Sequence, residues 1–162
     1  MTQTVRAMQK ILKDVPGAAE LIMENSAGGG QKIGASITEI GELRRRVASP
    51  RVKVCLDTAH AFEAGIIGAY TPKNLKELFD TFDRLIGLDH LAVIHANDSK
   101  TVYNSHHDQH ENIGEGHIGR QGFLALGKEK RLIHVPFILE VPGFTGEGPD
   151  KKNVNRLRSL LL

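Results

Sequence analysis

Cysteine is almost absent from this chain, and so is any long apolar run. The single cysteine, Cys55, excludes an internal disulfide, and its position inside a short apolar segment is typical of a small core residue in a reducing compartment. The amino terminus is polar and amphipathic, which argues against a signal peptide and against a membrane span. We therefore expect a cytoplasmic protein that has no membrane partner.

Neither sign of charge dominates the sequence. The formal net charge is +2 over 162 residues, without the basic tail or stripe that marks many nucleic-acid-binding proteins. Any polyanion would have to be held by local groups or by bound metal, so charge leaves the partner open. With 40% hydrophobic and 25% charged residues, the chain is typical of one globular domain over residues 1–162 and too short for two full domains.

The stretch from Val52 to His60, VKVCLDTAH, organises the rest of the chain. An apolar run interrupted only by Lys53 is typical of a strand that is covered on both faces, and it ends at Asp57. His60 follows three residues later, so one short loop carries two side chains that can bind metals, although they need not bind the same ion. A strand end that caps the next helix explains these residues equally well.

Three other apolar runs end in the same way. They are Glu20 to Asn25, which ends in Glu24 and Asn25, His90 to Asn97, which ends in His95 and Asn97, and Val135 to Glu140. The carboxyl ends of parallel strands lie on one face of an α/β sheet or barrel, where loops build active sites. A lone histidine in a strand is more often a hydrogen-bonded core residue than a ligand. Four ionisable side chains at equivalent places would each need a partner, and a shared cation is the simplest one.

Helices and loops are expected between these runs. Apolar residues at helical spacing, a capping box at Ser36 and Glu39, and a proline at a first turn after Thr71 mark the helices. The expected elements are a helix over Thr4 to Val15, a glycine-rich loop over Asn25 to Gly34, a helix from Ser36 to Val47, a loop over Ala61 to Tyr70, a helix from Thr71 that Gly87 stops, a helix over Gln121 to Lys128 and a terminal helix opened by Pro149.

The segment from Ala96 to Arg120 is the most polar and the richest in histidine. A loop of this length inside a compact domain is usually functional or disordered. The whole pattern amounts to four β/α units, half of an eight-stranded barrel that typically takes about 250 residues. The alternative is a small open α/β sheet, and in both cases the outer strands need cover or a partner.

Five motifs follow one another between Leu21 and Gly143: ENSAGGG, VCLDTAHAFEAG, HANDSK, DQHENIGEGHIG and FILEVPG. In this order they resemble the carboxyl-terminal half of endonuclease IV (deoxyribonuclease IV, apurinic/apyrimidinic endonuclease family 2). The sequence departs from the family at Ala59, where cysteine is frequent, and the family's first four β/α units have no counterpart in it. The resemblance implies parallel β/α units that form the carboxyl-terminal half of a TIM (β/α)8 barrel.

The resemblance also implies a set of site residues around three zinc ions, two of which Glu24 would bridge. The implied metal ligands are Glu24, Asp57, His95 and Glu140 around one ion and His60, Asp108 and His110 around another. The implied catalytic residues are Glu24 and Glu140. The candidates for binding substrate or orienting the ligands are Asn25, Asn97, Ser99 and Lys100. Two further histidine ligands belong to the family's first half, so we expect about two zinc ions in this chain.

The implied activity is zinc-dependent hydrolysis of the DNA phosphodiester 5′ to an abasic site in base excision repair, with abasic double-stranded DNA as partner. We expect this activity to be weak here unless a separate amino-terminal half-barrel completes the site. Two alternatives stay open. One is a metal-dependent sugar isomerase or epimerase of the related barrel type, against which DQH and IGEGHIG argue. The other is a non-catalytic half-barrel that binds metal, which the short length favours.

Overall fold

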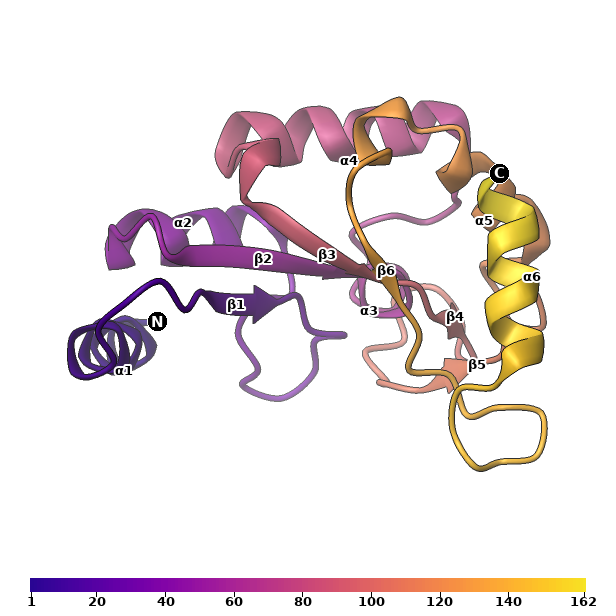
Figure 1. Cartoon of the computed structure of the whole chain (residues 1–162), viewed down its shortest axis with the longest axis horizontal. Helices are drawn as coiled ribbons and strands as arrows, with labels where there is room; N and C mark the ends of the chain where they lie inside the picture. Colours follow the sequence, from indigo (N-terminus) through magenta and orange to yellow (C-terminus); the bar gives the residue numbers. More distant parts are fainter.

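Four parallel strands form the sheet on which the rest of the chain is built (Figure 1). The computed structural model describes all of residues 1–162. The strands are β1 (Leu21–Glu24), β2 (Val52–Asp57), β3 (Leu91–His95) and β6 (Phe137–Ile138), and they lie in the order β1-β2-β3-β6. Because neighbours in the sheet follow one another in the sequence, each connection crosses over through helical structure, as in part of a TIM barrel. The predicted parallel β/α units are therefore confirmed.

The register of these strands brings their carboxyl ends level with one another. Glu24 lies opposite Cys55 in the β1–β2 ladder, and Asp57 lies opposite His95 in the β2–β3 ladder. The register shifts between Val54 and Cys55, which pair with Leu91 and Val93, so Ala92 of β3 has no partner in this ladder. As a result, the polar residues that end three different strands meet at one edge of the sheet.

Four of the six helices begin at a side-chain cap. They are α1 (Thr2–Asp14), α2 (Ile37–Val47), α3 (Thr58–Glu63), α4 (Pro72–Leu85), α5 (Gly119–Gly127) and α6 (Lys151–Leu161), with short 3-10 turns η1 (Leu88–His90) and η2 (Lys130–Leu132). The predicted caps Ser36 and Thr71 accept hydrogen bonds from the backbone of α2 and α4, and Asp57 and Asp150 cap α3 and α6 in the same way. The cap of the terminal helix, Asp150, thus lies one residue after the predicted Pro149.

One expected loop is wrong. The segment predicted as a loop from Ala61 to Tyr70 begins inside α3, which starts directly after β2 and continues to Glu63. The helix was missed because it has only 6 residues, too few for an apolar stripe to show. Its cap, Asp57, was weighed as a metal ligand and as a strand end that caps the next helix, and the structure confirms the strand end and the cap.

The long segment from Ala96 to Arg120 is ordered by a second, two-stranded sheet. Strands β4 (Asp98–Ser99) and β5 (His110–Glu111) pair in antiparallel fashion, so the segment folds back on itself. The Asp98 carboxylate is fully buried and accepts backbone hydrogen bonds of 2.9–3.2 Å from four residues of the IGEGHIG motif: Gly114, Gly116, Ile118 and Gly119. These bonds hold the motif against β4 at the point where α5 begins.

The core lies between the sheet and the helices that cover it. Its largest fully buried side chains include Phe79 and Phe82 of α4, Phe123 of α5 and Leu56 of β2. A smaller apolar cluster joins α1 and α2 to β2. Cys55 is buried, as predicted for a core residue. None of the helices combines the length and the apolar character needed to cross a bilayer.

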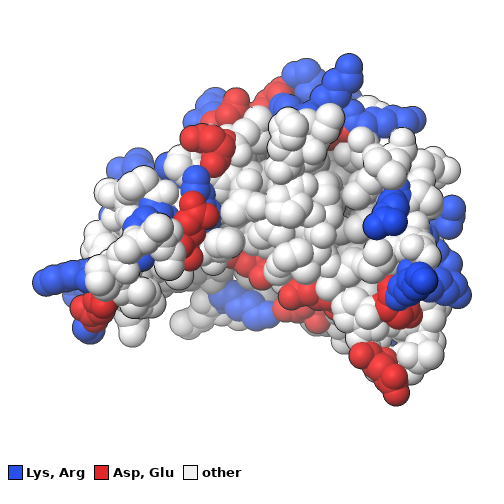
Figure 2. Space-filling model, in the orientation of Figure 1, with Lys and Arg blue, Asp and Glu red and all other residues white.

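The outer strands of the sheet leave apolar residues uncovered. Ile22 of β1 is 46% exposed and Ile138 of β6 is 49% exposed, and a hollow of about 500 Å³ beside β6 is lined mainly by apolar residues of β6 and α6. Figure 2 shows that the middle of the face in view is largely free of Lys, Arg, Asp and Glu, which gather towards its margins. The sheet is therefore open at both edges, as the strand count led us to expect.

We predict that Asp98→Ala lowers the free energy of unfolding by about 3 kcal/mol or more. The substitution leaves several buried N–H groups without an acceptor, and each such group costs about 1–3 kcal/mol. Urea denaturation followed by circular dichroism measures the change. Asp89→Ala is the matched control, because the Asp89 side chain is 83% exposed and its removal should change stability by less than about 0.5 kcal/mol. Equal effects of the two substitutions would contradict the role given to Asp98.

Candidate metal centre

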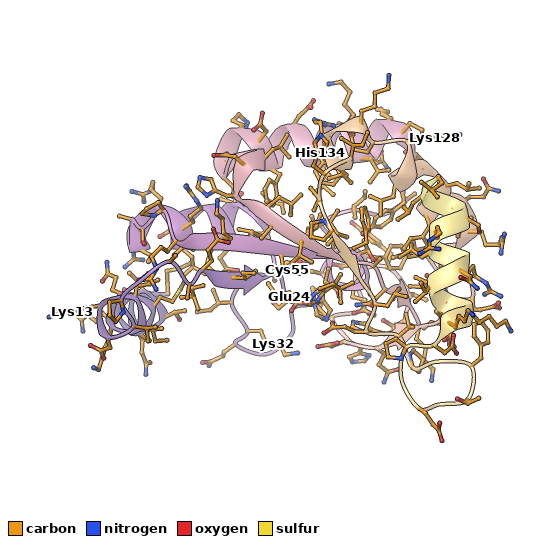
Figure 3. All side chains as sticks on the ribbon, in the orientation of Figure 1. Lys13, Glu24, Lys32, Cys55, Lys128 and His134 are labelled. Carbon is orange, nitrogen blue, oxygen red and sulfur yellow. The ribbon has the colours of Figure 1, made fainter.

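Four side chains converge where the parallel strands end, and we call them the strand-end cluster: Glu24, Asp57, His95 and Glu140. One ligand atom from each lies within 4.8 Å of one from every other member. His95 Nδ1 lies 3.1 Å from Glu24 Oε1 and 3.0 Å from Glu140 Oε2. Figure 3 labels Glu24 at the end of β1, beside Cys55 of β2. The structure thus brings together residues that are up to 116 positions apart in the sequence, since Glu24 ends the first strand and Glu140 follows the last.

A second group, the loop cluster, consists of His60, Asp108 and His110. His60 Nε2 lies 3.1 Å from Asp108 Oδ1 and 3.4 Å from His110 Nε2, and His110 Nε2 lies 3.9 Å from the same Asp108 oxygen. The two histidines come from different elements, α3 and β5, and Asp108 comes from the loop just before β5. The cluster therefore depends on how that loop packs against α3.

Contacts to backbone carbonyl oxygens orient both imidazole rings of the loop cluster. His60 Nδ1 lies 2.9 Å from Asn25 O, and His110 Nδ1 lies 3.3 Å from Glu140 O. An Nδ1–H that donates to a carbonyl leaves Nε2 as the free lone pair, which is the arrangement of a metal-binding histidine and its supporting partner. In both residues it is Nε2 that faces Asp108.

Asp57 and Glu24 connect the two clusters. Asp57 groups with His60 and His110 as well as with the strand-end cluster, and its Oδ2 lies 3.7 Å from His110 Nε2. Glu24 Oε1 lies 3.1 Å from His95 Nδ1 and 3.3 Å from His60 Nδ1. The resemblance implied that Glu24 bridges the strand-end ion and the site whose two histidines belong to the family's first half, and it assigned Asp57 to the strand-end group alone. The geometry extends Asp57 to both.

Burial and the neighbouring charged groups shift the pKa values of the ionisable side chains in this centre. Burial raises the pKa of Asp57, which is 0% exposed, more than the neighbouring His60 and His110 lower it. Burial lowers the pKa of His60, but the carboxylates of Glu24, Asp57 and Asp108 outweigh it and raise this pKa to about 10. Burial also raises the pKa values of Glu24 and Asp108, and in both the contacts with histidine prevail and hold the pKa below its usual range.

The donor sets and their spacing fit zinc. Zinc binds imidazole nitrogen and carboxylate oxygen at about 2.0–2.2 Å, so two ligand atoms of a tetrahedral site stand about 3.3–3.6 Å apart. The separations of 3.0–4.0 Å between His95 and the three carboxylates of the strand-end cluster, and of 3.1–3.9 Å in the loop cluster, lie around these values. Cys55 forms a further group with Glu24 and His95, but burial and the nearby Glu24 raise the pKa of its thiol well above the usual range. Burial therefore disfavours the thiolate, which is the metal-binding form of cysteine.

Asn25 and Asn97, two of the candidates for substrate binding, are buried and hold the centre together. The Asn97 amide donates to Asp57 Oδ2 at 2.6 Å, and its Oδ1 accepts from the Glu140 backbone at 2.8 Å. Asn25 makes a pair of bonds with the Asp57 backbone, at 2.6 and 3.0 Å. Of the two roles considered from the sequence, these contacts favour orienting the ligands over contacting a substrate.

The other two candidates for substrate binding separate. Ser99 is buried, and its hydroxyl lies 2.8 Å from Glu63 Oε1, so it faces the protein interior. Lys100 is exposed. Sequence reasoning missed Glu63, a fully buried carboxylate three residues after His60, because it lay in the segment predicted as a loop. A glutamate between Phe62 and Ala64 in an otherwise apolar stretch was the available signal.

We predict a pH effect on the metal-free protein that depends on His60. Its pKa is about 10 in the folded state and about 6.5 when unfolded. A raised histidine pKa stabilises the fold fully below pH 6.5, and this contribution disappears as the pH rises through 10. Urea unfolding in the presence of a chelator should therefore show the stability difference between wild type and His60→Gln shrinking from pH 6.5 to pH 10. A difference that is constant or grows with pH would contradict the assigned contacts.

The comparisons with known proteins agree with this geometry. Residues 2–160 match the family model described as xylose isomerase-like TIM barrel. The "Probable endonuclease 4" of Halothermothrix orenii is 42% identical over 159 residues, which make up 98% of this chain and 57% of that protein. The chain thus spans little more than half the length of this curated relative.

Solved structures give the same result at the level of the fold. The crystal structure of endonuclease IV from Thermus thermophilus superposes with a TM-score of 0.79 and 33% identity, covering 98% of this chain and 57% of that one. A D-tagatose 3-epimerase-like protein superposes with a TM-score of 0.66 at 21% identity, over 98% of this chain and 52% of its own, and shares the fold alone. The resemblance to endonuclease IV that the motifs indicate is confirmed, and the chain belongs to the xylose isomerase-like TIM barrel family.

Proposed function

We propose that this chain carries the metal-binding part of a zinc-dependent apurinic/apyrimidinic endonuclease. The reaction is hydrolysis of the DNA phosphodiester 5′ to an abasic site, which leaves a 3′ hydroxyl and a 5′ deoxyribose phosphate, as in base excision repair. The observation that carries the proposal is the pair of imidazole and carboxylate clusters joined by Asp57 and Glu24. Relatives named probable endonuclease 4 support the nuclease assignment.

The ligand assignment follows the two clusters. His60, Asp108 and His110 would hold one zinc ion, and the strand-end cluster would hold another. Bound zinc lowers the pKa of a coordinated water and offsets the negative charge of a phosphate. The carboxylates of Glu24 and Glu140 flank His95 at 3.0–3.1 Å, which suits them to orient the attacking water as catalytic residues.

The partner in this proposal is double-stranded DNA with abasic sites. The proposed location is the cytoplasm, and no membrane takes part. Lys100 is the candidate that remains exposed for a backbone phosphate, while Asn25 and Asn97 bond to Asp57 and Ser99 bonds to Glu63. Because the chain spans 57% of a relative, a separate amino-terminal half-barrel is proposed to supply the remaining ligands and DNA contacts.

The nuclease proposal accounts for more of the site than a sugar isomerase or epimerase would. An isomerase with one metal gives a role to Glu24, Asp57, His95 and Glu140. It leaves the loop cluster without one, although His60, Asp108 and His110 converge within 3.9 Å and two of them are turned by backbone carbonyls. Since one fold hosts many activities, the loop cluster is the feature that favours the nuclease.

We predict that the purified chain retains about two zinc ions after dialysis, and that His110→Ala retains one fewer. His110 supplies one of three ligands in the loop cluster, so its loss should empty that position and leave the strand-end cluster filled. Elemental analysis measures the stoichiometry. His134→Ala is the control, because His134 is exposed and lies near the start of β6, away from Glu24 (Figure 3). A folded wild-type chain that holds no metal would refute the assignment.

We predict that the chain alone nicks a duplex with one tetrahydrofuran abasic analogue only weakly, and that an amino-terminal half-barrel of a relative raises the rate by orders of magnitude. Losing two histidine ligands weakens the zinc that activates water, and about 1.4 kcal/mol of lost transition-state stabilisation costs a factor of ten. Glu140→Gln should abolish nicking by the combined halves. The control Glu147→Gln, on an exposed residue outside both clusters, should not. Nicking that survives Glu140→Gln, or epimerisation of a sugar instead, would overturn the proposal.

A further inference from the structure

Glu63 is a charged side chain that neither metal cluster uses. It is the last residue of α3, three positions after His60, and it is 0% exposed. Burying a carboxylate is costly unless hydrogen bonds to its oxygens compensate for the lost water. The partners of Glu63 therefore indicate why the chain keeps it inside.

These partners come from the segment that leads to the loop cluster. Glu63 Oε1 accepts from Ser99 Oγ at 2.8 Å, from Thr101 Oγ1 at 3.1 Å and from the Gln109 backbone N–H at 3.4 Å. Gln109 is the residue between Asp108 and His110. Glu63, on the helix that carries His60, thus accepts a hydrogen bond from the backbone between the two other ligands, Asp108 and His110. Glu63 Oε2 is buried without a hydrogen-bond partner, so all the hydrogen bonds of this carboxylate act through one oxygen.

The same segment also caps the end of α3. The backbone N–H of Asn104 donates to Phe62 O at 3.2 Å, and that of His106 donates to Glu63 O at 3.0 Å. The last carbonyls of a helix have no partner inside the helix, so these bonds satisfy groups that would otherwise be unpaired. Helix α3 and the segment from Ser99 to His110 consequently form one hydrogen-bonded unit.

We propose that Glu63 is a positioning residue that holds Asp108 and His110 at metal-binding distance from His60. Asp108 lies in a loop and His110 in a strand of only 2 residues, so the pairing of β4 with β5 leaves part of the order that the site needs to partners outside the segment. Glu63 supplies an acceptor at the two ends of this segment, Ser99 and Thr101 at one end and Gln109 at the other. The inference rests on the proposed function in that the held ion is the zinc of the loop cluster.

The test compares Glu63→Met with Glu63→Gln. Methionine keeps the length and removes the acceptor, whereas glutamine keeps an acceptor oxygen. We expect Glu63→Met to speed hydrogen exchange at the Gln109 amide about tenfold or more and to weaken zinc binding to the loop cluster about 10–100-fold. In calorimetric titrations the weakened step should be the one that His110→Ala removes, and the step of the strand-end cluster should not change. Glu63→Gln should restore most of both properties.

Matched variants separate positioning from general stability. Glu77→Met on α4 replaces an exposed glutamate by the same residue and should alter neither property. Thr101→Val removes one donor to Glu63, and its effect should not add to that of Glu63→Met because both break the same contact. Hydrogen exchange and zinc affinity that are unchanged in Glu63→Met, or zinc affinity that falls equally at both clusters, would overturn the inference. A wild-type chain without a zinc step would instead refute the proposed function.

Discussion

The centre depends on one constraint, which is that the Asp57 carboxylate is completely buried. A buried carboxylate needs hydrogen-bond donors, and the structure supplies them from two segments, the start of α3 and the loop after β3. Asp57 Oδ1 accepts from the His60 backbone at 2.8 Å, which starts α3, and Oδ2 accepts from the Asn97 amide at 2.6 Å, which holds the segment after β3. The end of β2, the start of α3 and the loop after β3 are therefore joined at one group. Asp57 groups with His60 and His110 as well as with the other members of the strand-end cluster.

Buried carboxylates also order the parts of the chain that have little secondary structure. Asp98 accepts hydrogen bonds from backbone amides of the IGEGHIG motif, and Glu63 accepts them from hydroxyls and a backbone amide of the segment before β5. In both cases a side chain satisfies the backbone or hydroxyl groups that a helix or a sheet would otherwise pair. This explains how a segment of 25 residues between Ala96 and Arg120 carries ligands at defined distances.

The two clusters differ in what they say about function. The strand-end cluster follows from the parallel sheet, because any such fold places the carboxyl ends of its strands together. The epimerase-like neighbour shares that fold at 21% identity, so the sheet does not separate the two kinds of enzyme. The loop cluster depends on the particular contacts of His60, Asp108 and His110, and it carries the argument for a nuclease.

Local signals in the sequence determined most of the elements and many of the candidate ligands. The strand over Val52 to Asp57, the caps at Ser36 and Thr71 and the polar strand ends depend on residues close together in the chain, so periodicity and capping predict them. Only the tertiary structure decided that Asp57 faces both clusters, that Asn25 and Asn97 hold the ligands and that Glu63 lies buried beneath the loop. The physical reason is that burial and hydrogen bonding between residues 32 to 46 positions apart depend on which segments pack together, and no local pattern contains that information.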